Sequence, residues 1–96
     1  AAIPEELSIQ GNYPNPFNPV TTIRFGLPEP RRVSLTIVNM LGQEVADLLN
    51  GWKDLGHHEI RWQSFDNQGV PVASGVYFAL LRDGTSIDVR KMILLK

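Results

Sequence analysis

Residues 12–25 read NYPNPFNPVTTIRF, in which eight residues with three prolines and three asparagines run directly into an alternating strand. Proline donates no backbone hydrogen bond, and it favours extended geometry in the residue before it. Asn15 and Asn18 can bond their own backbone as turn initiators. Such a segment can wrap around a sandwich edge and block edge-to-edge pairing. We therefore predict a structural role for it, with Tyr13 and Phe17 as its anchors in the core.

The rest of the chain repeats short apolar–polar alternations, separated by turn signals such as Pro28-Glu29-Pro30 and Asp83-Gly84. Trp62 reads as a core tryptophan, and residues 51–56 read as a loop. The alternation is least clean in residues 44–49. This pattern predicts an all-β fold, an immunoglobulin-like antiparallel β-sandwich of about seven strands. The predicted strands are residues 7–9, 21–27, 33–38, 44–49, 58–62, 75–82 and 85–96.

Composition narrows the class of protein. The net charge of −1 with 43% hydrophobic residues is typical of a globular domain and not of a nucleic-acid-binding one. The absence of cysteine excludes disulfides, zinc–thiolate sites and a thiol nucleophile. No apolar run approaches the about 18 residues that span a membrane. We expect residues 1–96 to form one domain, with residues 1–10 as a lead or linker from a longer upstream protein.

Two clusters could bind a metal ion. In His57-His58-Glu59, neighbouring strand residues point to opposite faces, so the two histidines cannot share one metal, and His58 is expected on the core face. The run Asp66-Asn67-Gln68-Gly69, with Asp54, offers oxygens for calcium, but a tight turn explains it equally and the EF-hand pattern is missing. Ser74-Gly75 lacks the Gly-x-Ser-x-Gly elbow of hydrolases. We predict no catalytic, cofactor or metal residues, and no enzyme activity.

Trp52 lies in a Gly-flanked polar stretch. If it is exposed near Tyr13 or Phe65, it could stack on a sugar ring, which would indicate a carbohydrate-binding module. The alternative is that Trp52 covers one end of the sandwich, and we favour that interpretation.

Five motifs occur in a familiar order. These are NYPNPFNPVTTIRF, VSLTIVNMLGQEVADLL, GHHEIRW, GVPVASGVYFALL and RKMILLK. Together, from about Leu7 to Lys96, they resemble the type A C-terminal sorting domain of type IX secretion cargo. That family is also similar to the immunoglobulin-like domain of the flagellar hook-capping protein. The resemblance again implies a sandwich of about seven strands.

The resemblance also implies partners and residues. The partners would be the outer-membrane type IX translocon, a sortase-like peptidase and a covalently linked upstream cargo domain, in a secreted or cell-surface protein of Bacteroidetes and their relatives. The implied sorting signal is Lys91, Met92, Ile93, Leu94, Leu95 and Lys96. The implied structural positions are Asn12, Pro14, Asn15, Pro16, Phe17, Asn18 and Pro19 in the proline motif, and Gly69, Val72, Ser74, Gly75, Val76 and Tyr77 in the Gly-rich motif.

The chain departs from the family pattern at three places. Val38 stands where the family usually has tyrosine, Trp62-Gln63-Ser64 stands where it has Trp-Asp-Gly, and Ala79-Leu80-Leu81 stands where it has an aromatic-rich end of the strand. The second departure removes an aspartate and weakens the calcium interpretation further.

The last strand is compatible with a signal, although its composition alone favours a closing strand of the sandwich, and it is the resemblance that favours the signal. Its apolar residues 92–95 are bracketed by Arg90, Lys91 and Lys96, and a final edge strand can be read by β-augmentation. Strands that are apolar on both faces, such as residues 76–81, could also pair in a homodimer or lie under a neighbouring domain. We predict a non-enzymatic targeting domain that directs a larger protein through the type IX machinery to the cell surface. The alternatives are a carbohydrate-binding module and a structural immunoglobulin-like spacer.

Overall fold

The computed structural model describes residues 3–96. These residues form strands and no helix, so the described part of the chain has no helix that could cross a membrane. The strands are Ser8–Tyr13 (β1), Thr21–Leu27 (β2), Arg31–Asn39 (β3), Glu44–Lys53 (β4), Gly56–Trp62 (β5), Gly75–Arg82 (β6) and Ile87–Leu94 (β7).

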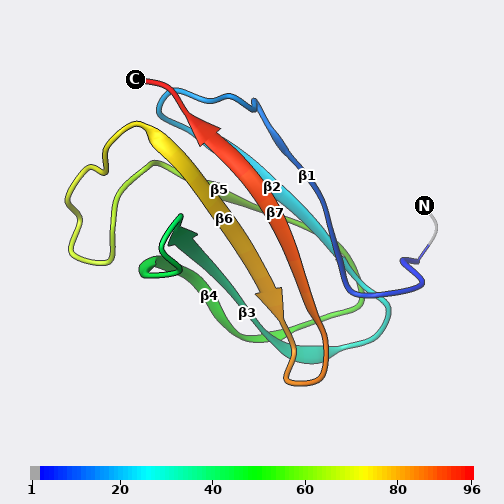
Figure 1. The fold of residues 1–96 in the computed structure, drawn as a ribbon. Coiled ribbons are helices and arrows are strands. Elements are labelled where there is room, and N and C mark those ends of the chain that lie inside the picture. The colour runs from blue at the N-terminus through cyan, green and yellow to red at the C-terminus, as the bar shows by residue number, and fades with distance from the viewer. Residues whose placement is uncertain (1–2) are drawn as a thin grey trace.

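The strands form two antiparallel sheets that pack face to face (Figure 1). The three-stranded sheet has the order β1-β2-β5 and the four-stranded sheet the order β4-β3-β6-β7. Every neighbouring pair within a sheet is antiparallel. This arrangement confirms the predicted all-β sandwich of seven strands. It also places the edge strands β1 and β7 side by side.

The core fills the space between the sheets with the inward-facing residues of both. Trp62 is 2% exposed, as the sequence predicted, and its ring meets Tyr77 edge-on at 5.4 Å between centroids. Leu7 and Ile9, which fall in the predicted lead, are buried in the same core. Ala1 and Ala2, the first residues of that lead, lie outside the described residues.

Strand β4 differs most from the sequence prediction. It continues to Lys53, so the predicted loop of residues 51–56 shrinks to Asp54 and Leu55 between β4 and β5. Its register with β3 shifts twice, which leaves Val45 and Leu48 as extra residues. Each bulge places two consecutive residues on the core side, because Val45 and Leu48 pack against the core together with their neighbours. The bulges explain the unclean alternation in the sequence.

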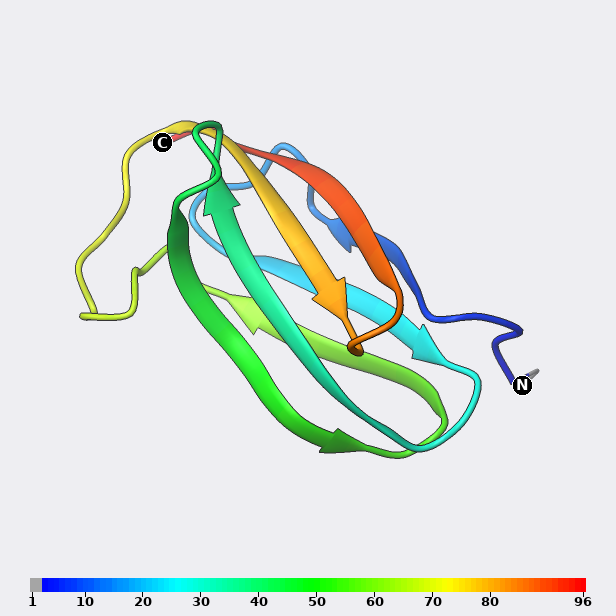
Figure 2. The ribbon, with the colours of Figure 1, turned by 60° about the horizontal axis from the view of Figure 1, so that its bottom comes forward.

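The connection of residues 63–74 extends away from the body of the sandwich (Figure 2). Asn67 binds the free edge of β4, because its Oδ1 accepts from Asp47 N at 2.8 Å and its own N donates to Val45 O at 3.0 Å. Ser64 has φ 66°, in the left-handed region that glycine occupies most easily. Its Oγ donates to Pro19 O, so its side chain ties this connection to the proline motif.

Candidate recognition site at the C-terminal strand

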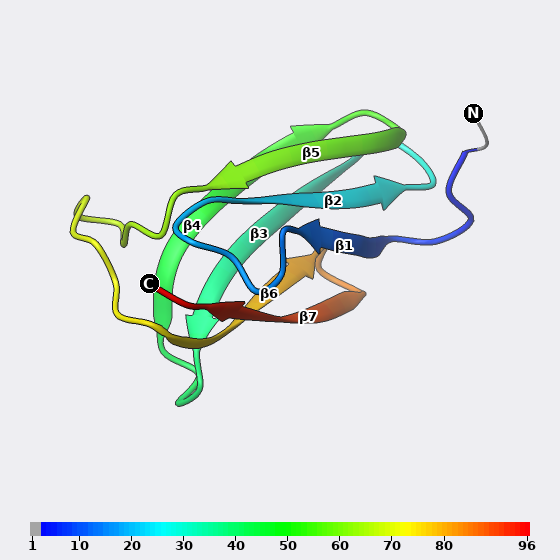
Figure 3. The same ribbon diagram turned by 90° about the horizontal axis from the view of Figure 1, so that it is seen from above.

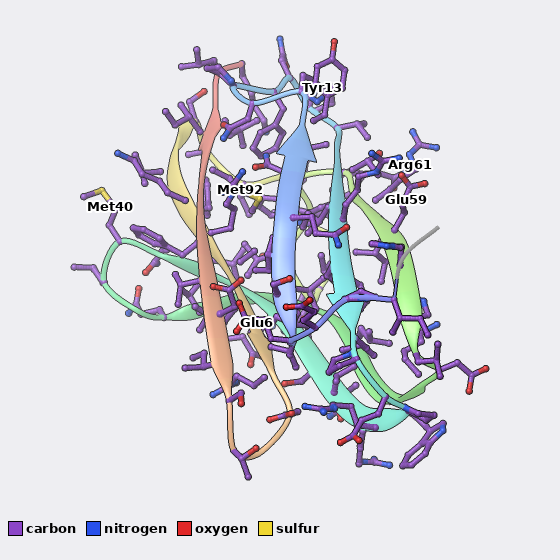
Figure 4. The ribbon with its side chains drawn as sticks, turned by 90° about the vertical axis from the view of Figure 1, so that its right-hand side faces the viewer. Glu6, Tyr13, Met40, Glu59, Arg61 and Met92 are labelled. Atoms are coloured by element: carbon purple, nitrogen blue, oxygen red, sulfur yellow. The ribbon has the colours of Figure 1, made fainter. Side chains whose placement is uncertain are left out.

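Strand β7 carries the implied sorting signal at the edge of the four-stranded sheet. Its partner within the sheet is β6, with Tyr77 opposite Met92 and Gly75 opposite Leu94. Met92 and Leu94 point into the core and are fully buried, and Figure 4 shows the Met92 side chain inside the sandwich. Lys91 and Lys96 are exposed. Alternation along the strand therefore divides the motif into a buried half and a displayed half.

The displayed half has its own chemical character. Leu95 is 55% exposed and Ile93 is half-buried. With Lys91 and Lys96 they present two cations and two aliphatic side chains at one end of the molecule. A receptor that meets the folded domain can touch these residues, whereas Met92 and Leu94 are accessible only if the strand leaves the sandwich.

The proline motif binds the outer edge of this strand. Phe17 forms an isolated parallel bridge with β7, in which its N donates to Ile93 O at 2.9 Å and its O accepts from Leu95 N at 3.0 Å. Asn15 adds two side-chain bonds, accepting from Ile93 N at 3.0 Å and donating to Lys91 O at 3.4 Å. The predicted role in blocking a sandwich edge is confirmed. The Asn15 amide reaches the terminal strand, whereas we had expected it to bond its own backbone.

The two predicted aromatic anchors behave differently. Phe17 is 2% exposed and its ring lies 5.8 Å from that of Trp62. Tyr13 is 81% exposed, and Figure 4 shows it pointing outward, so its prediction as a core anchor is wrong. Tyr13 pairs with Thr22 at the end of β1, where the strand alternation turns it away from the core.

The Gly-rich motif also reaches the C-terminal residues. Ser74 Oγ accepts a hydrogen bond from Lys96 N at 2.9 Å. Tyr77 donates its hydroxyl to Ala73 O at 2.6 Å, and burial raises the pKa of this phenol. The proline motif and the Gly-rich motif, far apart in the sequence, therefore meet at the same terminal segment and hold its two sides.

The first half of β7 is attached to β1 instead. Asp88 Oδ2 accepts from Ile9 N at 2.6 Å. The guanidinium of Arg90 lies 3.3 Å from the point where a Cβ on Gly11 would stand, so glycine at this position leaves room for it. The backbone edge that we had expected a receptor to use is therefore occupied by the chain itself along residues 91–95 and contacted at Asp88.

The turn between β6 and β7 sets where the terminal strand begins. Asp83 Oδ1 accepts from Thr85 N at 3.0 Å and Ser86 N at 2.7 Å, and Arg31 pairs with its other oxygen. The two backbone hydrogen bonds, with a smaller contribution from Arg31, lower the pKa of Asp83 to about 2.

The two clusters considered above as metal sites have hydrogen-bond and ring partners within the chain. Asp66 Oδ1 accepts from Gln68 N and Val70 N at 2.9 Å, so these residues form the tight turn that was the alternative to a calcium site. His58 is half-buried, stacked on Phe25 with 5.2 Å between the ring centroids, and hydrogen-bonded to Asp54 O. Within residues 3–96, no three His, Cys, Asp or Glu side chains gather at one point.

Trp52 does not cover an end of the sandwich, so the interpretation that we favoured is wrong. It lies on edge strand β4, opposite Arg32, and is 65% exposed. The strand register places it beside the β2–β3 connection, at the opposite end of the sandwich from Tyr13 and Phe65. The arrangement therefore gives Trp52 neither of the two aromatic partners expected for a sugar platform.

The structure is an antiparallel β-sandwich of seven strands, in which two motifs far apart in the sequence bind the segment that includes the last strand. The family model for the secretion system C-terminal sorting domain matches residues 12–95. The chain therefore belongs to the family of secretion system C-terminal sorting domains. Comparison with curated protein sequences gives no match.

Two of the solved structures that share the fold come from the same bacterium. One is PorZ, an essential bacterial surface component of the type IX secretion system of Porphyromonas gingivalis, with a TM-score of 0.63 and 22% identity over 92% of this chain. The other is dimeric latent PorU from Porphyromonas gingivalis, with a TM-score of 0.71 and 20% identity over 99% of this chain. The chain spans 11% of the first protein and 10% of the second.

Proposed function

We propose that this domain is a non-enzymatic targeting module, which directs a larger upstream protein through the outer-membrane type IX machinery to the cell surface or the medium. The observation that carries the proposal is the family match together with the terminal strand, which is fixed on one side by Asn15 and Phe17 and on the other by Ser74. Because two motifs hold residues 91–96 in a fixed position, the domain is suited to presenting these residues to a receptor.

The signal itself is assigned to the displayed half of the terminal segment. Lys91, Ile93, Leu95 and Lys96 would contact the translocon, while Met92 and Leu94 would support them from the core. A sortase-like peptidase and a covalently linked cargo are the further partners that this role requires. We also propose that the domain can pair with a second copy through its exposed apolar strands, and one structural neighbour is described as dimeric.

A secretion assay tests the sorting role. Residues 1–96 are fused behind a signal peptide and a fluorescent reporter in a bacterium with a working type IX system. Truncation at Arg90 is a poor test, because it removes the buried Met92 and Leu94 together with the signal. The better variant combines Lys91→Ala, Leu95→Ala and Lys96→Ala, which leaves the core side chains in place.

The matched control replaces one leucine and two cations that are also exposed elsewhere, Leu41→Ala, Arg32→Ala and Arg61→Ala. We expect the terminal triple variant to keep the reporter in the periplasm and the control to export it, with both proteins folded by circular dichroism. Equal export of the two variants would overturn the assignment of the signal to this surface.

The carbohydrate-binding alternative stays a prediction with its own test. It requires sugar affinity that falls in Trp52→Ala, whereas a purely structural spacer requires neither sugar binding nor dependence of export on the terminal residues. Calorimetric titration of the domain with soluble polysaccharide tests the carbohydrate-binding alternative, and the export assay with the terminal triple variant separates the sorting role from a structural spacer.

A further inference from the structure

The outer face of the four-stranded sheet carries an apolar band across three strands. Figure 3 shows the backbone of both sheets from above. In β6 the outward residues Val76, Phe78 and Leu80 are half-buried aliphatic and aromatic side chains that pair in register with residues of β3 and β7, and the exposed Arg82 ends the same face. Val38 is 9% exposed yet is not a member of the inter-sheet core cluster, because it packs on this outer face. The band consists of Val38, Val76, Phe78, Leu80, Val89 and Ile93.

Opposite charges flank this band. Lys91 stands on the β7 margin, opposite Phe78 in the register. Glu44 and Asp47 stand on the β4 margin, because the bulges at Val45 and Leu48 turn the neighbouring apolar residues inward. Glu44 accepts one hydrogen bond from Asn67, and Asp47 accepts one from Thr36. Within residues 3–96, none of these three charged groups forms an ion pair.

The charges and the apolar residues form rows across the sheet. One row reads Glu44, Val38, Phe78 and Lys91, from the β4 margin to the β7 margin. A two-fold axis parallel to the strands, between β3 and β6, would exchange β4 with β7 and β3 with β6. In a face-to-face pair related by this axis, Lys91 meets Glu44 of the partner subunit and Phe78 meets Val38 of the partner subunit. Each contact occurs twice, as an isologous interface requires.

We infer that this face binds a second copy of the chain in that two-fold arrangement. The inference deepens the proposed pairing through exposed apolar strands, and it does not depend on the sorting role. Packed sheets cross at about 30°, and the flexible Lys and Glu side chains can span the resulting offset. The order of charges disfavours a two-fold axis perpendicular to the strands, because that axis would place the β7 margin with Lys91 opposite the same margin of the partner and away from the partner's Glu44.

The size of the face indicates a weak dimer. Four strands about 4.8 Å apart, each with about eight residues at about 3.3 Å, give a face of roughly 500 Å². Two copies would therefore bury about 1,000 Å² in total, the lower end of the range for specific interfaces. The dimer should accordingly form at micromolar or higher concentration, and it should weaken with added salt because its charged pairs are at the margin.

Charge exchange tests this geometry by sedimentation equilibrium of the purified chain from micromolar to millimolar concentration. Lys91→Glu and Glu44→Lys each replace two attractive contacts with two repulsive ones, so each variant should dimerise about tenfold more weakly at low salt. An equimolar mixture of the two variants should recover dimer. In the mixed pair, position 91 of each chain again faces a position 44 of opposite charge on the other chain.

Controls with the same change of charge are Arg61→Glu, on the outer face of the other sheet, and Glu5→Lys, before β1. Both should leave dimerisation unchanged. A wild-type chain that stays monomeric at millimolar concentration would overturn the inference. The inference would also be overturned if neither charge reversal weakened dimerisation, or if mixing the two variants did not restore the dimer. Because this readout uses purified protein, its failure is independent of any loss of export in cells.

Discussion

Replacing Phe17 tests whether the proline motif is part of the scaffold that holds the terminal strand. Phe17 is 2% exposed, its ring packs against Trp62, and its backbone bonds Ile93 and Leu95. In Phe17→Ala the backbone bonds remain possible, but the side chain that presses the segment against the core is lost. We therefore expect global destabilisation and local loosening of β7.

The magnitude follows from the burial. Removal of a buried phenylalanine ring costs about 3–5 kcal/mol, of which the contact with Trp62 contributes about 0.5–1.5 kcal/mol. A chain of 96 residues is ordinarily stable by about 5–14 kcal/mol. The variant should thus lose at least about a fifth of its stability, and its melting temperature should fall by at least about 12 °C.

Urea unfolding followed by tryptophan fluorescence measures this loss, since Trp62 lies beside the deleted ring. Tyr13→Ala is the matched control, because it removes an aromatic ring from the same segment that is 81% exposed. The control should change the free energy of unfolding by less than about 0.5 kcal/mol. If the two variants lose similar stability, the contrast between a buried Phe17 and an exposed Tyr13 is refuted.

Three further perturbations probe the terminal strand. In Asn15→Ala, the amide in β7 that binds Asn15 Oδ1 should exchange hydrogen faster, while amides of β2 keep their protection; unchanged exchange would count against the clamp. Asp83 has its pKa lowered from 3.8 to about 2, so its stabilising contribution is full above about pH 4 and is lost towards pH 2. Asp83→Asn should flatten the fall in unfolding free energy over that window, and an unchanged slope would contradict this. Met92→Ala should cost about 2–5 kcal/mol, whereas Leu95→Ala should cost under about 0.5 kcal/mol, by the same unfolding assay. Equal losses would mean that the strand does not alternate as described.

Much of the fold could be predicted because its local signals agree with its pairing. The strand Thr21–Leu27 has the predicted bounds, since clean alternation ends at Pro28, which cannot continue a ladder. The strand Gly75–Arg82 also has the predicted bounds, between a glycine and the Asp83 turn. In such segments residues at the strand ends fix the strand bounds, so tertiary contacts change these bounds little.

The errors arise where a distant partner decides the outcome. Trp52 is in a strand because β4 pairs with β3 as far as Arg32, beyond two bulges, and the irregular alternation of residues 44–49 does not show that the strand continues after them. Tyr13 and Phe17 are both aromatic residues in one motif, and their outcomes depend on distant partners, since Tyr13 pairs with β2 and Phe17 with β7. Neither outcome follows from the residue types alone.

The residues of the terminal motif differ in burial, so each of them should be interpreted by its own position in the strand. Alternation buries Met92 and Leu94 and exposes Lys91 and Leu95, so a loss of export in a truncated chain cannot distinguish a missing signal from a missing core. Asn15 and Ser74 act on the same segment from outside it, each through a side chain bonded to its backbone. Variants at these two residues should therefore reduce export only to the extent that they increase hydrogen exchange in the terminal strand. A defect at Lys91 or Leu95, in contrast, should appear without any change in hydrogen exchange along β7. Comparing export with exchange in the same variants separates the residues that a receptor contacts from those that hold them in place.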